Sequence, residues 1–484
     1  MTFPQASAGR APLAVSPTRS VPIAPCAQGA LCAQGALFVL GVLFVLGALG
    51  GSPALADMAE DEGPARLTAE QTELNVASFD MIWETIRDKH WDPELGGLDW
   101  AAVRDTLRPR VAAAATMDEA RRYMSAAIAE LGQSHFAVFP ADVYHDAPGQ
   151  DDGGAEEDVL EDLAPEGGAG VTGLEVRLTD EGLLVFRVQP DSPAAAAGVA
   201  PGWQVVAIVG KEVAPRIAKL RELLAGEITM PLVVARAMAA RMEGDIGETV
   251  DIDFRDPADR EVALGLTLAA PRGKSAAFGN LPAVHVWYDR DELPGGIGYF
   301  GFNYFLGVME IMPAYNQAMQ DFRDGRGIIV DLRGNVGGIG VMAMGMSSWF
   351  FADKGHQLGT MITRGGELNF AVNPRPNAYT GPLAVLVDAL SASTSEIMAG
   401  GLKDLGRARL FGTRTAGAAL PSVIERLPNG DGFQYAIANY VSAGGDTLEG
   451  GGVEPDEDIP LSREALARDP DPVLTAAARW LREQ

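Results

Sequence analysis

The chain has 484 residues, of which 47% are hydrophobic, and a formal net charge of −27. This length allows two to four domains, and the hydrophobic fraction excludes a mostly disordered protein. The negative charge argues against binding to nucleic acids and to anionic membrane surfaces, because both need cationic patches on the protein.

The first 56 residues have the pattern of an export signal. Arg10 and Arg19 precede an apolar run at 36–51, and the small-x-small sequence Ala-Leu-Ala follows at 54–56. We expect cleavage after Ala56, a periplasmic or secreted protein, and no stable membrane span after cleavage. An uncleaved, signal-anchored form is the alternative, although the apolar run is shorter than the roughly 20 residues that span a bilayer.

The cysteines and histidines give no pattern of a metal site. Both cysteines, Cys26 and Cys32, precede the expected cleavage site, so the mature chain would have no disulfide and no thiolate chemistry. The five histidines show neither HxxxH nor HxH spacing. We therefore predict no metal site, and no organic cofactor is needed for the reaction inferred below.

Two regions follow the expected signal. Residues 57–145 are predicted to be helical, because apolar positions recur at helical spacing at 77–91 and 117–131. Residues 146–168 are acidic and rich in glycine, which predicts a solvated linker.

The remainder of the chain changes its pattern near residue 275. Residues 169–272 contain short apolar runs with turn signals between them, which predicts a β-rich domain, with a short helix and a turn at 192–203. Residues 278–484 alternate predicted strands with predicted helices and end in a helix. That alternation predicts an α/β core in which helices flank a sheet.

The stretch LAVLVDALSASTSEIMAGG at 383–401 is the most informative part of this core. It reads as an apolar strand, a short turn and a helix that begins near Thr394, with Ser393 at the junction. The first N–H groups of a helix lack internal partners, so a hydroxyl placed there can attack a carbonyl while those groups hold the oxyanion. A plain capping serine is the alternative.

Two other segments offer groups that a nucleophilic serine needs. The turn GIIVDLRGNVGGIG at 327–340 lacks the spacing of a nucleotide-binding loop, but its glycines could present an N–H to a substrate oxygen. A tight turn that merely requires glycine is the alternative. A base is also needed, and histidine suits it near neutral pH. His135 follows the helical region directly after Ser134.

Three motifs carry a resemblance to a known family. In their order and spacing, DLRGNVGG, SASTSEIMAGGLKDLGRA and EGGGVEPD resemble the C-terminal processing (tail-specific) serine proteases, which are relatives of the tricorn core protease. The resemblance covers nearly the whole mature chain, including the HWDPELGGLDW stretch of the helical region. It implies a ClpP/crotonase-like fold for the core and a PDZ-like domain for residues 169–272.

The chain departs from the tail-specific branch at the catalytic base. That branch places a lysine 25 residues after the serine, where this chain has Ala418, and no lysine occurs from 404 to 484. The resemblance therefore points to the tricorn-like branch, which uses a Ser-His pair, a serine nucleophile and a glutamate before a Gly-Val-x-Pro-Asp loop.

The resemblance assigns a role to each matching residue. Ser393 would be the nucleophile and His135 its general base, while Glu449 and Ser134 would orient and polarise the imidazole. The oxyanion hole would be formed by backbone N–H groups, those of Thr394 and of either Gly338 or Gly337, with Gly338 preferred. In the PDZ-like domain, the residues expected to take a peptide carboxylate are Gly173, Leu174 and Val176. A PDZ-like spacer without a ligand is the alternative.

The sequence thus predicts an exported serine endopeptidase that forms an acyl-enzyme on Ser393. Its substrates would be polypeptides, with recognition of an apolar C-terminus as a hypothesis; the sequence predicts no oligomeric state. A non-catalytic protein that binds peptides or hydrophobic ligands on the same scaffold is the main alternative. An esterase that uses the same residues is a further one.

Overall fold

The structure is a computed structural model that describes residues 66–141, 169–224, 226–277 and 283–484. The chain divides into two units, 1–37 and 38–484, and every described residue belongs to the second. The expected export signal at 1–56 and the acidic linker at 146–168 lie outside the described residues. In the part of the chain that is described, no helix is both long and apolar enough to cross a bilayer.

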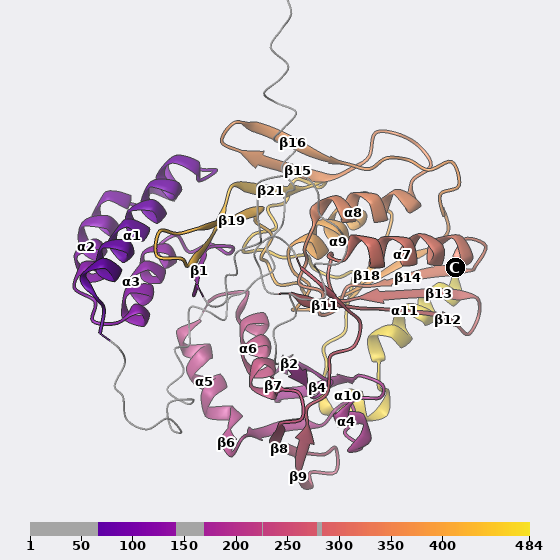
Figure 1. Ribbon diagram of the computed structural model, residues 1–484. Coiled ribbons are helices and arrows are strands. Elements are labelled where there is room, and N and C mark those ends of the chain that lie inside the picture. The colour runs from indigo at the N-terminus through magenta and orange to yellow at the C-terminus, as the bar shows by residue number, and fades with distance from the viewer. Residues whose placement is uncertain (1–65, 142–168, 225, 278–282) are drawn as a thin grey trace, which may run out of the picture. The chain divides into compact units, whose positions relative to one another are not determined.

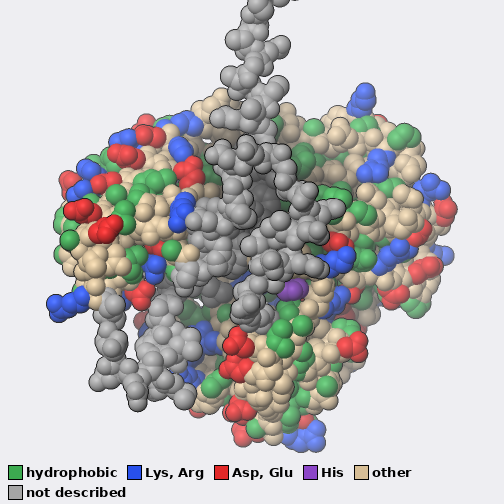
Figure 2. All heavy atoms as spheres, in the orientation of Figure 1, with side chains coloured by type: hydrophobic (Ala, Val, Ile, Leu, Met, Phe, Trp, Pro, Cys, Tyr) green, Lys and Arg blue, Asp and Glu red, His purple; other side chains and the backbone are tan. Residues whose placement is uncertain are grey.

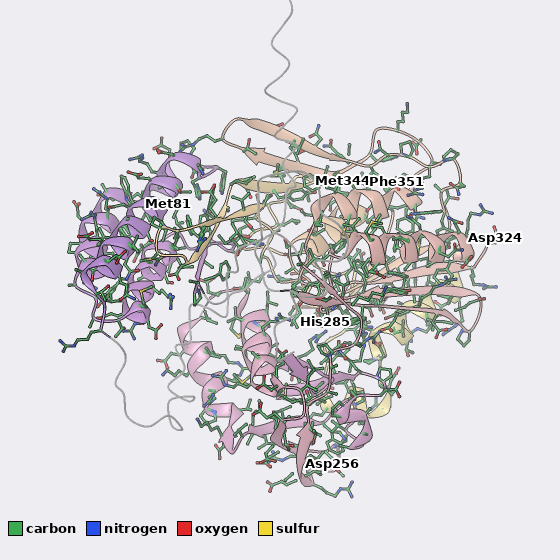
Figure 3. All side chains as sticks on the ribbon, in the orientation of Figure 1. Met81, Asp256, His285, Asp324, Met344 and Phe351 are labelled. Atoms are coloured by element: carbon green, nitrogen blue, oxygen red, sulfur yellow. The ribbon has the colours of Figure 1, made fainter. Side chains whose placement is uncertain are left out.

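The N-terminal region is helical, as the periodicity predicts, and its described part contains three α-helices. These are α1 (Ala69–Lys89), α2 (Trp100–Ala112) and α3 (Met117–Ala129). Each begins at a residue whose side chain accepts a backbone N–H, namely Thr68, Asp99 and Thr116, so polar caps set the helix starts. The helices bury one shared cluster that includes Phe79, and Met81, labelled in Figure 3, packs against it from α1.

The region at 169–272 forms a second body around its own sheet. The strand order is β3-β4-β5-β8-β9, with β6 paired to β5. Asp256, labelled in Figure 3, accepts the N–H groups of Ala258 and Arg260 in the turn between β8 and β9. The bounds are β3 (Leu174–Thr179), β4 (Gly182–Val188), β5 (Gln204–Ile208), β6 (Lys211–Glu212), β8 (Thr249–Arg255) and β9 (Glu261–Thr267).

Helices in this region extend the sequence prediction. The short helix expected at 192–203 is α4 (Pro193–Ala196). Two longer helices, α5 (Val213–Leu223) and α6 (Met230–Ala239), were not predicted in a region read as β-rich. Short strands β2 (Ala169–Val171) and β7 (Glu243–Asp245) pair beside them.

The third region contains a sheet with helices beside it, as the alternating pattern predicts, and this sheet has six strands. Its order is β12-β13-β14-β17-β18-β22, with parallel pairing from β13 to β22 and β12 antiparallel at one edge. The bounds are β12 (Tyr288–Leu293), β13 (Ile297–Phe302), β14 (Gly327–Asp331), β17 (Leu383–Val387), β18 (Arg409–Gly412) and β22 (Glu457–Asp458).

Helices cover both faces of this sheet, so its central strands are apolar throughout. Helices α7 (Val308–Phe322), α8 (Gly340–Ser347) and α9 (Thr394–Asp404) lie on one face, and α11 (Pro472–Glu483) lies on the other (Figure 1). Alternate residues of β14 pack on the two faces of the sheet. Ile328 and Val330 pack with α7–α9, whereas Ile329 packs with α11.

Smaller sheets join the regions. Strand β1 (Ala137–Phe139), just after the N-terminal helices, pairs with β20 (Gly432–Ala436), and β19 (Ser422–Arg426) completes that sheet. A second sheet has the order β16-β15-β21 and a hairpin pairs β10 with β11. The remaining bounds are β10 (Lys274–Ala276), β11 (Val284–Val286), β15 (Gln357–Thr363), β16 (Gly366–Ala371), β21 (Ala438–Ser442) and α10 (Arg463–Arg468).

Charged side chains of both signs lie on the face of the molecule drawn in Figure 2. On the face drawn in Figure 2, lysine and arginine side chains are interspersed with acidic ones, and those of the described residues form no continuous basic patch there.

Candidate active site

Ser393 lies at a strained junction between β17 and α9. It immediately precedes the first residue of α9, its backbone has φ 58° and ψ −118°, and it is 0% exposed. Residues other than glycine rarely adopt positive φ, and such strain persists only where the surroundings enforce it. The tight turn that follows the buried strand thus presents the serine at the N-terminus of the helix.

The Ser393 side chain is in capping-box register with the backbone N–H of Glu396, but its hydroxyl makes no side-chain cap hydrogen bond. Among the described residues, none forms a hydrogen bond with Ser393 Oγ, although the atom is buried. The side-chain oxygen of a capping serine normally accepts a hydrogen bond from a backbone N–H of the helix. A buried hydroxyl without a partner is costly, and it is therefore a candidate for a functional role.

The glycine turn at 337–338 lies against this serine. A Cβ at Gly337 would stand 2.7 Å from Ser393 Cβ, and both glycines have positive φ, 102° and 139°. Gly337 donates its N–H to Asn335 Oδ1 at 3.0 Å. Thr394 Oγ1 donates to the carbonyl of Gly338 at 2.8 Å. Because the Gly337 N–H is already engaged, Gly338 is the better of the two candidates for binding an oxyanion.

Ser134, His135 and Glu449 form one hydrogen-bonded group, although 315 residues separate the first from the last. Ser134 donates its N–H to Glu449 Oε1 at 2.7 Å and its hydroxyl to Oε2 at 2.8 Å. The same hydroxyl lies 2.6 Å from His135 Nδ1.

The donor count in this group determines the histidine tautomer. A hydroxyl has one proton, and an ionised carboxylate only accepts, so the Ser134 proton goes to Glu449. Ser134 Oγ must then accept from His135 Nδ1, which therefore carries the ring proton. His135 Nε2 is left with its lone pair, as a general base requires. The His135 backbone has φ 63°, so this residue is also held in a strained conformation.

Burial raises the pKa of Glu449, while the N–H groups of Ser134 and Ala419 and the Ser134 hydroxyl oppose that shift. The charge of Glu227 adds to the increase in this pKa. Glu449 Oε2 also accepts the Ala419 N–H at 3.0 Å. Because both carboxylate oxygens accept hydrogen bonds, the network is complete only when Glu449 is ionised.

Glu396 is a buried residue of the site that the sequence analysis did not identify. Its Oε2 accepts the N–H groups of Ser393 and Ala418, each at 3.0 Å. Its Oε1 accepts the Thr415 hydroxyl at 2.6 Å and the Gly417 N–H at 2.8 Å. One carboxylate thus ties the serine turn to the loop 415–419, which in turn donates to Glu449. The Ser-x-x-Glu spacing of a capping box, present at 393–396, was the available signal.

Burial raises the pKa of Glu396 to about 7 from its ordinary value of 4.5, against its four hydrogen bonds. Because the pKa of Glu396 is higher in the folded state than in the unfolded chain, its contribution to the free energy of unfolding is fully present below about pH 4.5. That contribution is lost as the pH rises to about 7. The expected loss is up to about 3 kcal/mol, which is the difference of pKa values converted to free energy.

We therefore expect Glu396→Gln, which does not titrate, to lack this loss. Urea unfolding of both proteins from pH 4.5 to 8 measures it as the difference between their unfolding free energies. If the unfolding free energies of the two proteins changed in parallel over that pH range, the raised pKa of Glu396 would be contradicted.

The nucleophile and the base are not hydrogen-bonded in this structure, since Ser393 Oγ has no partner among the described residues. Catalytic hydrogen bonds are often long before substrate binds, so this geometry is compatible with the roles inferred from the resemblance. Ile228, between α5 and α6, lies against the loop at Gly417, where an added Cβ would meet its side chain at 2.8 Å. A substrate reaches Ser393 only if covering residues move.

The candidate peptide-binding residues belong to the region at 169–272, which carries none of Ser134, His135, Ser393 and Glu449. Gly173 precedes β3, and Leu174 and Val176 lie on it. Among the described strands, β3 lies at the edge of its sheet, so one side of its backbone pairs with no other described strand. None of the hydrogen bonds described above connects these three residues to Ser393, His135 or Glu449.

Buried ion pairs link the same strand to the glycine turn, and these residues were not predicted from the sequence. Arg177 on β3 donates to Asp388 Oδ2 at 2.6 Å, and Asp388 Oδ1 accepts the Gly334 N–H at 2.9 Å. Beside them, Arg333 donates to Asp331 at 2.7 Å. Although burial opposes it, the charge and hydrogen bonds of Arg333, with the charge of Arg187, hold the pKa of Asp331 far below its usual range.

Within the described ranges, no three or more His, Cys, Asp or Glu side chains are grouped so as to hold a metal ion. His285 and His356 lie on β11 and before β15, on segments other than those that carry the Ser134–His135–Glu449 group (His285 is labelled in Figure 3).

Two family models match the chain. Residues 296–459 match peptidase family S41, and residues 77–129 match the tricorn protease C1 domain. The first range contains Ser393, Glu396 and Glu449, and the second covers most of the N-terminal helices.

Curated relatives support the same family. A carboxyl-terminal-processing protease of Picosynechococcus is 27% identical over 386 residues, which cover 78% of this chain and 82% of that protein. Tricorn protease homolog 1 of Streptomyces coelicolor is 26% identical over 437 residues, covering 86% of this chain but only 36% of that protein.

Solved structures share the fold. The photosystem II D1 C-terminal processing protease aligns with a TM-score of 0.52 at 20% identity, over 86% of this chain and 98% of that one. Mature CPAF aligns with a TM-score of 0.55 at 13% identity, over 85% and 96%. The α/β class with N-terminal helices is thereby confirmed. The matches together support a serine-type peptidase in which residues 296–459 match peptidase family S41.

Proposed function

We propose that the chain hydrolyses peptide bonds through an acyl-enzyme on Ser393, with His135 as the general base. The observation that carries the proposal is the Ser134–His135–Glu449 network, because its hydrogen bonds leave the lone pair of the imidazole on Nε2. Ala418, at the position of the lysine in the tail-specific branch, is buried and has no basic group.

The reaction follows from these positions. His135 Nε2 takes the proton of Ser393 as Oγ attacks the substrate carbonyl, and the N–H groups of Gly338 and Thr394 stabilise the oxyanion. The imidazolium then protonates the leaving amine, and the acyl-enzyme forms. Water, deprotonated by the same nitrogen, releases the second product. Glu449, acting through Ser134, stabilises the imidazolium in both halves of the reaction.

Peptide recognition is proposed for the second body, which we infer to be PDZ-like. Its edge strand β3 begins just after Gly173, and α6 packs beside that strand. A peptide added to β3 would pair with its free backbone edge, with the loop at Gly173 near its carboxylate. Recognition of a substrate C-terminus agrees with the names of two relatives, which are carboxyl-terminal-processing proteases.

Export is proposed from the sequence alone. The apolar run at 36–51 and the small residues at 54–56 support a cleaved signal, and a periplasmic or secreted site of action follows.

Hydrolysis of a polypeptide tests the proposal against its two alternatives. The purified protein is incubated with an unstructured polypeptide that ends in apolar residues and, separately, with a matched peptide and its ester. A peptidase is supported if mass spectrometry finds cleavage fragments of the polypeptide and if kcat/KM can be measured for the peptide as well as for the ester. Turnover of the ester alone would favour an esterase. Binding without turnover would favour the non-catalytic protein, for which the full burial of Ser393 is the specific observation.

A further inference from the structure

His90 is a buried histidine that the proposed mechanism does not use. It caps the C-terminus of α1, where its backbone N–H donates to Ile86 O at 3.1 Å, and its side chain is fully buried. It begins the HWDPELGGLDW stretch of the sequence. A buried ring with two polar atoms must satisfy both, so its partners indicate what the residue holds in place.

One of these hydrogen-bond partners and one stacking contact of the His90 ring flank the Ser134–His135 pair. His90 Nε2 lies 3.0 Å from Gln133 Oε1, and Nδ1 lies 3.0 Å from the N–H of Asp92. The ring also stacks on Phe136, with 5.7 Å between centroids and 20° between planes. One side chain therefore contacts the residue before Ser134 and the residue after His135.

The segment held in this way is strained. His135 has a φ of 63° although it carries a bulky side chain, and such a conformation persists only when its surroundings fix it. Glu449 fixes Ser134 from one side through two hydrogen bonds. His90 contacts Gln133 and Phe136 and supplies a second attachment.

His90 is itself tied to the S41 domain. Arg364, in the turn between β15 and β16, donates to the carbonyl oxygens of Arg87 and Asp88, the last turn of α1. These hydrogen bonds hold the end of α1, and with it His90, on the domain that carries Ser393.

We propose that His90, through its hydrogen bond to Gln133, is a positioning residue that holds the Ser134–His135 turn so that His135 Nε2 faces Ser393. The proposal rests on the function proposed above. It extends that function to a residue more than 40 positions before the base, in the tricorn C1-like region.

Two matched substitutions test this role. The amide of glutamine reaches the place of the imidazole Nε2, whereas that of asparagine reaches only the place of Nδ1. We expect His90→Asn to lower kcat about 10- to 100-fold with KM nearly unchanged, because a small misplacement of a catalytic group costs that much. His90→Gln should retain kcat within about threefold. In His90→Asn the acidic limb of the kcat/KM profile should move to lower pH, because the imidazolium loses part of its support.

Gln133→Leu provides a second route, since Gln133 is only partly buried and its loss should leave the fold intact. Its kcat should fall as in His90→Asn, and the double variant should be no worse than either single variant. His356→Asn, at a histidine that bonds Asp353, is the control and should be unchanged.

The outcomes separate this inference from the proposed function. An inactive wild-type enzyme that fluorophosphonate does not label would overturn the function, and the inference with it. An active wild-type enzyme, with wild-type kcat and pH profile in both His90→Asn and Gln133→Leu, would overturn the inference alone. Equal loss in His90→Asn and His90→Gln, with Gln133→Leu normal, would also overturn it, because the link through Gln133 would then be irrelevant.

Discussion

Ser393→Ala is expected to lower kcat for peptide hydrolysis by about 10⁴- to 10⁶-fold, the range found when the nucleophile of a catalytic triad is removed. The fold should survive, because Ser393 Oγ makes no hydrogen bond with any described residue and its removal breaks none. The melting temperature should therefore stay within a few degrees of that of the wild type while activity disappears. Steady-state hydrolysis and thermal unfolding of the same preparation measure both.

Ser347→Ala is the matched control for this substitution. Ser347 lies on α8, and its hydroxyl is also buried without a partner among the described residues. Its loss should leave kcat unchanged. If both variants kept wild-type activity, Ser393 would not be the nucleophile.

Glu449→Gln is expected to lower kcat by about 10³- to 10⁴-fold, as in a triad whose histidine is held in the wrong tautomer. An amide group in place of Oε2 would donate to Ser134 Oγ and would also oppose the Ala419 N–H, which Oε2 accepts in the wild type. The Ser134 hydroxyl would then donate to His135 Nδ1 and force the ring proton onto Nε2, where it blocks the base. In the other orientation, the amide would face the Ser134 N–H, and two donors would oppose each other.

Measurement of kcat and KM separately tests this account. The loss should lie in kcat, because Glu449 contacts Ser134 and Ala419 rather than substrate. Glu425→Gln, which removes a partly exposed ion pair with Lys89, is the control and should leave kcat unchanged. A small loss in Glu449→Gln, comparable with that in the control, would show that this carboxylate does not set the tautomer.

Local patterns predict much of the core. The apolar run 383–387 followed by small polar residues predicted both β17 and the position of Ser393 at the start of α9. These features depend on neighbours in sequence, through strand burial and helix capping. The same logic would have found α5, since Val213, Ile217 and Leu220 recur at helical spacing in a region that was read as β-rich.

Long-range contacts explain what the patterns could not supply. Spacing alone gives no reason to bring Ser134 next to Glu449, 315 residues later, and only the family resemblance suggested it. The environment of Glu396 depends on Thr415 and Gly417, on a loop that has no secondary-structure signal of its own. The ion pair between Arg177 and Asp388 likewise arises from how β3 meets the turn after β17.

Labelling of the purified protein with a fluorophosphonate probe, followed by peptide mapping, tests the central claim most directly. The probe reacts only with an activated serine, so the account predicts labelling at Ser393 that is lost in Ser393→Ala and in His135→Ala. Glu449→Gln should be labelled much more slowly. A peptide ligand is included in a parallel sample, because Ser393 is fully buried and must become accessible. The absence of labelling in folded protein, with and without that peptide, would contradict the account and favour a binding protein on a peptidase scaffold.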